Sequence, residues 1–381
     1  LIRLWMDAGA MGLSTGLAYV PGTYSKTDEI IELASVVAEY VGGFYATHMR
    51  NENNDVQEAI VEALTIAQDG GLPLEISHFK VTGVINWGKS DAMLTEVKTA
   101  RQGGVDVMHD QYPYTASNGN IGLLFQDWAL AGGNTAVLNR LQNPASHATI
   151  HGELVTKIND LFNGDSGLIF VSSSSVPGVA GRTIKQISED SAWWNGTPSF
   201  DAAETIIEIV IRAGGAYTGT NCIYHSMSVY DVENIMKNDY TMIASDGSSM
   251  SNNNSPVAHP RNFGTFPRVL GYYCRDRQPP LLSLQDAVRK MTSLPALRLG
   301  FTNRGRIIEG YVADIVIFDK DVVKDQNDFE NPYSDPDGYP QGIDYVLVKG
   351  VLTINNIDTA YISTHGDTGA RAGKLLLRGQ Q

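Results

Sequence analysis

Cysteine, positive net charge and long apolar runs are all scarce in this sequence, and each shortage excludes a class of protein. The two cysteines, Cys222 and Cys274, are far apart and isolated, so neither a disulfide framework nor a four-thiolate zinc site is predicted. Lys and Arg number 28 against 42 Asp and Glu, and the net charge of −14 makes nucleic acid and anionic membrane surfaces poor partners. No apolar run approaches the roughly 18 residues that a membrane span needs. The remaining composition, 43% hydrophobic and 18% charged, predicts an ordinary globular protein.

A repeated unit organises the chain: a helical pattern, a double glycine and then a short apolar strand. The double glycines that precede a strand stand at 42–43, 70–71, 103–104 and 214–215. The helical patterns before them cover residues 28–40, 55–68, 90–102 and 201–212. Glycine just past a helix takes the left-handed conformation that ends it. This rhythm of about thirty residues predicts βα units and a parallel sheet.

The ends of these strands favour one arrangement of a parallel sheet. Histidine or aspartate follows most of them, which is typical of a TIM-type (β/α)8 barrel with its chemistry at the carboxyl-terminal rim. A doubly wound sheet would need a Gly-rich phosphate turn, and GAMGLSTG (9–16) neither fits GxGxxG nor follows a clear strand. Five or six barrel strands can be counted where eight are needed, and the chain begins at Leu1 as if inside a helix. We therefore expect an α/β barrel that is N-terminally incomplete.

Changes of pattern along the chain predict its domains. Residues 1–303 carry the barrel rhythm, interrupted at about 118–200 by a segment rich in Asn, Gly, Ser and aromatic residues. That segment is interpreted as a helical excursion above the rim, of the kind that shapes specificity. From about residue 304 the chain changes to short alternating β segments with turn residues, so 304–381 are predicted to form a small β domain.

Two segments of the same design carry the candidate chemistry. FYATHMR (44–50) and LEISHFK (74–80) each read as a buried strand that ends in a histidine, His48 or His78. Two imidazoles that leave neighbouring parallel strands at one level can bind a single metal ion. Asp246, in ASDG at the end of the predicted last strand, can take a proton from metal-activated water and pass it to a leaving amine. A hydrogen-bonded core histidine and a turn aspartate are the alternatives.

Cationic and phenolic side chains stand close to the same strand ends. Arg50 and Lys80 each follow a candidate histidine by two residues, and Arg261 lies in HPRNFG downstream of the ASDG segment. In an acidic protein, cations kept at the rim can bind a carboxylate. Tyr112 flanks Pro113 at another strand end and can donate its hydroxyl. Ordinary surface cations and a packed tyrosine are the alternatives.

Other histidines are weaker candidates. His109 and His225 also end predicted strands, but pocket lining or core packing explains them as well. His147 and His151 form HxxxH on an expected helix, where no glutamate follows the first histidine as a metalloprotease would require.

Several motifs in fixed order resemble one enzyme family. The segments are GAMGLSTGLAYVPG, FYATHMRNE, LEISHFKVTG, DQYPYTA, IASDG, HPRNFGTFPRVLG, MTSLPALRLG and RGRIIEGYVADIVIFD. Together they resemble the N-acyl-D-amino-acid deacylases (D-aminoacylases) of the amidohydrolase superfamily over nearly the whole chain. The resemblance weakens only at about 130–200.

The resemblance implies a fold, a metal and a reaction. The fold would be a (β/α)8 barrel with a small β-sandwich domain, and the metal would be zinc. His48 and His78 match the family's two single histidine ligands, and Asp246 matches its catalytic aspartate. The family holds the α-carboxylate of its small-molecule N-acyl amino acid substrate at the positions that match Lys80, Tyr112 and Arg261. The implied reaction releases a carboxylic acid and a free D-amino acid.

Two elements of the family pattern have no match in this chain. The family carries an HxH pair on its first strand and a cysteine or other bridging ligand on an early strand, and this sequence has neither in the matching context. We therefore expect that an N-terminal part precedes Leu1. Two alternative functions stay open: a cyclic amidase of dihydroorotase or hydantoinase type, which shares the barrel and metal, and a catalytically incomplete fragment.

Overall fold

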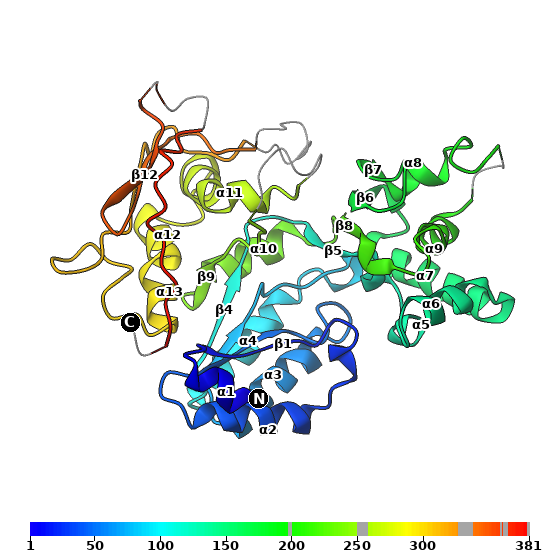
Figure 1. Cartoon of the computed structure of the whole chain (residues 1–381), viewed down its shortest axis with the longest axis horizontal. Helices are drawn as coiled ribbons and strands as arrows, with labels where there is room; N and C mark the ends of the chain where they lie inside the picture. Colours follow the sequence, from blue (N-terminus) through cyan, green and yellow to red (C-terminus); the bar gives the residue numbers. More distant parts are fainter. Residues whose placement is uncertain (197–199, 250–257, 327–337, 359, 361–364, 379–381) are drawn as a thin grey trace.

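A parallel sheet of five strands organises the first part of the fold in the computed structural model of this chain (Figure 1). The structure describes residues 1–196, 200–249, 258–326, 338–358, 360 and 365–378. The strand order is β1-β2-β3-β4-β9, and all neighbouring strands are parallel. The strands are β1 (Gly12–Gly16), β2 (Phe44–His48), β3 (Leu74–Ile76), β4 (Val107–Gln111) and β9 (Thr241–Ile243). The class is therefore α/β, with the carboxyl ends of all five strands at one edge.

Helices alternate with these strands along the chain, beginning with α1 before β1, and bury their apolar faces against the sheet. They are α1 (Ile2–Asp7), α2 (Thr27–Ala38), α3 (Val56–Gly70), α4 (Ser90–Gln102) and α10 (Val229–Lys237). In α3, Ile60 and Ala67 are buried in the same cluster as Tyr45 and Leu74 of the sheet. Full burial of one such isoleucine contributes about 1.5–3 kcal/mol. Gly71 then ends α3 with φ at 73°, a left-handed conformation that glycine adopts without strain.

Most strands of the sheet agree with the sequence prediction. The strands expected after the first three double glycines, and at 241–247, are confirmed as β2, β3, β4 and β9. The prediction missed β1, because GLSTG contains two glycines and no apolar run. Gly12 is needed there, since a Cβ at this position would collide with the carbonyl oxygen of Phe44 on β2. The described residues contain five parallel strands and no closed eight-stranded barrel.

A second unit, residues 117–224, lies beside the sheet and is called the inserted unit below. Its antiparallel sheet has the order β5-β8-β6-β7, formed by β5 (Ser117–Asn120), β6 (Ile169–Ser174), β7 (Arg182–Thr183) and β8 (Thr220–Tyr224). Its helices are α5 (Asp127–Leu130), α6 (Asn134–Gln142), α7 (Pro144–Phe162), α8 (Ile184–Ser188) and α9 (Ala202–Arg212). Figure 1 shows it in teal to green beside the parallel sheet, whose first four strands are blue to cyan and whose β9 is yellow-green.

The predicted course of the chain after residue 200 is wrong in one respect. The sequence analysis placed helix 201–212 and the following strand back in the barrel. Instead, β8 pairs antiparallel with β5 and β6, and α9 packs within the same inserted unit. A short apolar strand after a double glycine has the same local pattern in either sheet, and the pairing partner is decided by tertiary contacts. The inserted unit is therefore longer than the excursion predicted at 118–200, and it contains strands as well as helices.

The last part of the chain forms a three-stranded antiparallel sheet. Its strands are β10 (Ile315–Phe318), β11 (Ile343–Val348) and β12 (Val351–Asn355), in that order. The helices that precede it are α11 (Arg261–Arg268), the π-helix η7 (Val269–Asp276), α12 (Leu284–Met291) and α13 (Ser293–Arg298). Figure 1 shows these strands in orange and red above α12. The described residues show one sheet here and not the two packed sheets of a sandwich.

Among the residues that the structure describes, every helix is too short or too polar to cross a bilayer.

A buried ion pair joins α11 to the segment that follows β10. Arg268 Nη1 lies 2.9 Å from Asp325 Oδ2, and both side chains are less than a tenth exposed. We expect Asp325→Ala to lower the free energy of unfolding by about 3 kcal/mol, because it leaves a buried guanidinium without its counter-charge. Asp321→Ala is the matched control, since Asp321 pairs with the exposed Lys320 and the loss of this surface pair is expected to cost under about 1 kcal/mol. Urea denaturation measures both, and equal effects would contradict the prediction.

Candidate active site

Two histidines meet at the carboxyl edge of the parallel sheet. His48 is the last residue of β2, and His78 follows the end of β3, the neighbouring strand. His48 Nδ1 and His78 Nε2 face each other in hydrogen-bond contact, and the ring centroids are 4.3 Å apart. The structure therefore brings the two predicted metal ligands together, with one nitrogen of each ring directed to the same point.

Backbone conformation marks two of the predicted residues. His78 has φ at 39° and Asp246 has φ at 46°, a left-handed region that residues other than glycine rarely adopt. The backbone N–H of His78 donates to Asp110 Oδ1 at 2.7 Å, which holds the strained turn in place. Strain of this kind at strand ends is found where a side chain must be presented in a fixed direction.

Glu52 and Lys80 surround the second nitrogen of His78. Glu52 Oε1 lies 2.9 Å from His78 Nδ1 and 2.7 Å from Lys80 Nζ, and Lys80 Nζ is also 2.7 Å from His78 Nδ1. Burial raises the pKa of the Glu52 carboxyl, but the positive charges of Lys80 and His78 outweigh it and lower that pKa to about 2. An ionised carboxylate at Nδ1 can hold a proton there and leave the lone pair of Nε2 free. Sequence reasoning missed Glu52, whose only signal is its place in MRNE after His48.

The charge state of His48 suits metal binding. Burial lowers the pKa of its imidazole to about 4, and the nearby charges of His78 and Lys80 act in the same direction. The ring is therefore neutral at neutral pH, which is the form that donates a lone pair to a metal. The ring of Tyr19 packs edge-on against it, with the centroids 5.8 Å apart.

Asp246 and Arg261 form the opposite side of the site. Arg261 Nη1 lies 2.7 Å from Asp246 Oδ2, and the arginine side chain is buried. The charge of Asp246 acts on the imidazole of His48 and raises its pKa, so the carboxylate lies near the histidine pair. Arg261 Nε is buried and has no hydrogen-bond partner within the described part of the chain. An unpaired buried N–H of a guanidinium is a strong donor that a ligand can satisfy.

Tyr112 lies between the two cations of the site. Its ring centroid is 4.9 Å from the guanidinium carbon of Arg261 and 5.8 Å from Lys80 Nζ. Burial raises the pKa of its hydroxyl well above the ordinary value, so the group stays protonated and can donate. The structure thus brings Tyr112, Lys80 and Arg261 together.

Arg50 is placed differently from the other predicted cations. Its Nε and Nη2 donate to Glu62 at 2.8 Å, and Nη1 and Nη2 donate to the carbonyl oxygens of Thr23 and Ser25 at 2.7 and 2.8 Å. All three of its nitrogens are therefore used by the protein. Arg50 and Lys80 each follow a candidate histidine by two residues. The partners of Arg50, however, come from α3 and from the loop after β1.

The weaker histidine candidates have structural partners. His109 is fully buried between the ring of Phe79 and the hydroxyl of Thr241. His147 Nε2 lies 2.8 Å from Glu204 Oε2, and His151 Nε2 lies 2.8 Å from a carboxylate oxygen of Asp201. The HxxxH pair therefore joins α7 to the start of α9.

His259 is a further residue that sequence reasoning missed. Its Nδ1 accepts the backbone N–H of Arg261 at 3.0 Å, and its Nε2 lies 3.0 Å from the carbonyl oxygen of Ala116. Its ring stands edge-on to Tyr112 and Tyr114. This buried imidazole fixes the start of α11 and thereby the direction of Arg261. Only its position in HPRNFG, two residues before the arginine, offered a signal.

The histidine pair and Glu52 provide part of the donor set that a zinc site needs. Two imidazole nitrogens converge, and an ionised carboxylate lies against the other nitrogen of His78, which is the ligand type and outer-shell arrangement that Zn²⁺ prefers. Across the ranges that the structure describes, no group of three His, Cys, Asp or Glu side chains is arranged to bind one metal ion. His48 and His78 are therefore the ligands that this part of the chain offers.

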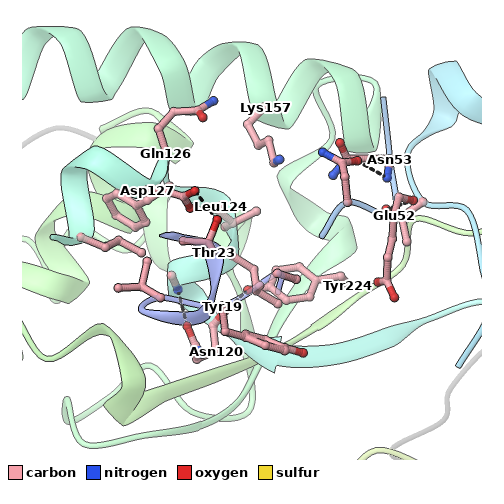
Figure 2. Close-up of a pocket in the computed structure, with 18 of the residues that line it drawn as sticks. Tyr19, Thr23, Glu52, Asn53, Asn120, Leu124, Gln126, Asp127, Lys157 and Tyr224 are labelled. Carbon is pink, nitrogen blue, oxygen red and sulfur yellow. Dashed lines mark hydrogen bonds between the residues drawn. The ribbon is translucent and has the colours of Figure 1, made fainter. Parts of the chain in front are cut away.

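A pocket of about 380 Å³ adjoins the histidine pair (Figure 2). Tyr19 and Glu52 line its end beside the histidines, and residues of the inserted unit, including Leu124 and Lys157, line the rest. The site therefore has a binding space beside it, formed by two different parts of the fold.

Comparison with known proteins gives one consistent result. Residues 202–354 match the model of the amidohydrolase family. The curated D-aminoacylase of Alcaligenes xylosoxydans xylosoxydans is 34% identical over 375 residues, which cover 98% of this chain and 62% of that protein. The chain thus spans about three fifths of the length of the curated relatives that it matches.

Two solved structures resemble the fold. The crystal structure of a D-aminoacylase superposes with a TM-score of 0.74 at 31% identity, covering 98% of this chain and 64% of that chain. The N-acyl-D-glutamate deacylase of Bordetella bronchiseptica, crystallised with zinc and a phosphonate mimic of the tetrahedral intermediate, gives a TM-score of 0.71 at 30% identity. That match covers 94% of this chain and 62% of the other.

Proposed function

Because this chain belongs to the N-acyl-D-amino-acid deacylase family of amidohydrolases, we propose that it hydrolyses the amide bond of N-acyl-D-amino acids. The products are a carboxylic acid and a D-amino acid. The grouping of His48, His78, Asp246 and Arg261 at the carboxyl edge of the sheet is the observation that carries this proposal. Chemistry at that edge is the rule for barrels of this kind.

Zinc is the metal in this proposal, and His48 Nδ1 and His78 Nε2 would hold it. When bound there, zinc supplies Lewis acidity toward the amide carbonyl and a water molecule. Glu52 keeps the His78 ring oriented through Nδ1, and the burial that keeps the His48 ring neutral preserves its lone pair.

Asp246 acts as the proton carrier. It accepts a proton from the attacking water as the water oxygen bonds to the carbonyl carbon, and it returns that proton to the nitrogen as the C–N bond breaks. Its left-handed backbone and its 2.7 Å contact with Arg261 fix the direction of the carboxylate. A fixed direction matters because proton transfer requires hydrogen-bond distance.

Arg261, Lys80 and Tyr112 bind the α-carboxylate of the substrate. The unpaired Nε of Arg261 supplies a donor, the Tyr112 hydroxyl supplies a second, and Lys80 adds positive charge. A carboxylate fixed on one side of the scissile amide leaves room for only one hand of the α-carbon. Arg50 has no substrate role in this proposal, because Glu62 and two carbonyl oxygens already use its nitrogens.

We also infer that the parallel sheet is part of a (β/α)8 barrel and that β10–β12 belong to a small β-sandwich. The parallel order of five strands, the site at their carboxyl ends and the resemblance to solved D-aminoacylase structures support this.

A stereospecific assay tests the proposed reaction. The protein, expressed from its complete gene and loaded with zinc, is given N-acetyl-D- and N-acetyl-L-amino acids, and the free amino acid is measured by chiral chromatography. We expect the D-substrates to react at least about 100-fold faster than their L-forms. Equal rates, or no hydrolysis with zinc present, would contradict the proposal. Ring opening of a hydantoin or of dihydroorotate without action on open-chain substrates would favour a cyclic amidase.

His259→Ala is expected to weaken substrate binding. Loss of the acceptor for the Arg261 backbone N–H frees the start of α11, so KM should rise about tenfold while kcat changes little. His259→Asn, which keeps an acceptor near the position of Nδ1, should restore much of the affinity. A fall in kcat alone, or no rescue by asparagine, would argue against this positioning role.

A further inference from the structure

The pocket beside the histidine pair continues away from the reacting groups toward the inserted unit. One end is lined by Tyr19 and Glu52, which contact the rings of His48 and His78. The other end lies under α7, which contributes Lys157. Figure 2 shows this lysine reaching down from its helix into the space between Asp127 and Asn53. The pocket can therefore accept a part of a substrate whose amide lies at the histidines.

Four charged side chains line the pocket, and three of them have protein partners. Arg50 pairs with Glu62, and Glu52 pairs with Lys80. The third, Asp127, accepts a hydrogen bond from the Thr23 hydroxyl at 2.6 Å. Arg50 is the other cation of the pocket, and its nitrogens are already bonded to Glu62 and to two backbone carbonyl oxygens.

Lys157 is the fourth, and its ammonium group makes no hydrogen bond or ion pair with the described residues. The side chain is only partly exposed. Burial lowers its pKa, while the more distant carboxylates of Asp160, Asp127 and Asp55 act in the opposite direction. A partly buried ammonium without a direct partner is a costly arrangement that an anionic ligand would relieve.

We propose that this pocket binds an arm of the substrate that ends in a carboxylate, and that Lys157 is the specificity-determining residue that pairs with it. This inference rests on the proposed deacylase function and names a substrate class for it. The arm has two chemical sources, the side chain of an acidic D-amino acid or a dicarboxylic acyl group on the nitrogen. Uncharged polar groups such as Asn53, Asn120 and Gln126 line the path and can hydrogen-bond to either arm.

Pairs of substrates that differ only in charge test the proposal. N-acetyl-D-glutamate is compared with N-acetyl-D-glutamine, N-acetyl-D-2-aminoadipate tests a longer arm, and N-succinyl-D-alanine is compared with its terminal amide. We expect the charged member of at least one pair to have a kcat/KM at least tenfold higher. The pair that shows the preference identifies which arm occupies the pocket.

Variants of Lys157 assign the preference to this residue. Lys157→Met should lower kcat/KM at least tenfold for the charged substrate and leave the neutral one within about twofold, and Lys157→Arg should keep the preference. Lys98→Met, a change at an exposed lysine of α4, is the matched control and should change nothing. Equal losses on charged and neutral substrates, or no charge preference in the unchanged protein, would overturn the inference.

A binding measurement separates this inference from the proposed reaction. Calorimetry with N-acetyl-D-glutamate or N-succinyl-D-alanine as the probe is carried out on Asp246→Asn protein, with and without Lys157→Met. Binding that Lys157→Met weakens at least tenfold supports the pocket even if no substrate is hydrolysed, in which case only the proposed reaction fails. If neutral substrates are hydrolysed but Lys157→Met leaves the affinity for the probe unchanged, only the proposed role of this pocket is wrong.

Discussion

Asp246→Asn is expected to lower kcat by about 10³-fold while the protein stays folded. General acid–base catalysis by one side chain contributes about 10²–10⁴-fold, and this carboxylate is the proton carrier that we propose. Asparagine is the appropriate replacement, because it has the same shape and tolerates the left-handed backbone at φ 46° that alanine would strain. Initial rates with an N-acetyl-D-amino acid measure the effect.

Two controls belong to this experiment. Circular dichroism and zinc content should match those of the unchanged protein, so that a lower rate reports chemistry. Asp276→Asn, which changes an aspartate paired with Arg275 at the surface, should leave kcat within about twofold. A variant at residue 246 that keeps more than about a tenth of the rate would remove this residue from the catalytic step.

His78→Asn is expected to weaken zinc binding by at least about 100-fold and to abolish activity at ordinary zinc concentrations. The replacement removes one of the two imidazole nitrogens that converge at the sheet edge but keeps a residue that accepts φ at 39°. Loss of an outer partner alone typically costs 10–100-fold in metal affinity, so Glu52→Gln should give an intermediate effect. Competition with a chromophoric chelator measures affinity directly.

A remote histidine provides the comparison for this series. His151→Gln changes an imidazole that pairs with Asp201 at the surface of α7, and it should leave zinc affinity unchanged. Zinc affinity that stays the same in His78→Asn would show that the histidine pair has a structural role. An ordered series, with Glu52→Gln between the unchanged protein and His78→Asn, is the result that supports the metal site.

The sequence alone was sufficient for most of the parallel sheet. Helical spacing of apolar residues, double glycines and short apolar runs are local signals, and they predicted β2, β3, β4 and β9 correctly. Where the local signal was absent, as in the glycine-containing β1, the prediction failed. Where one signal fits two environments, as in β8, the strand was found but its sheet was wrong.

The candidate site, like the fold, could be predicted from the sequence only in part. Residues that follow a strand directly, such as His48 and His78, could be placed from the sequence, because parallel strands end at a common edge. Arg50 and Lys80 had the same spacing, yet one pairs with Glu62 on a helix and the other with Glu52 in the site. No local pattern distinguishes those partners, since both ion pairs join residues from different elements.

What the sequence determined by itself was the repeat of helix and strand and the residue type at each strand end. The tertiary structure decided which charges are paired and which are left for a ligand. Arg261 Nε and Lys157 Nζ are both cationic donors that lack a partner in the described structure, one beside Asp246 and one beneath α7. Their availability follows from how the inserted unit and α11 pack around the sheet, because the presence or absence of a counter-charge depends on distances in space and not along the chain.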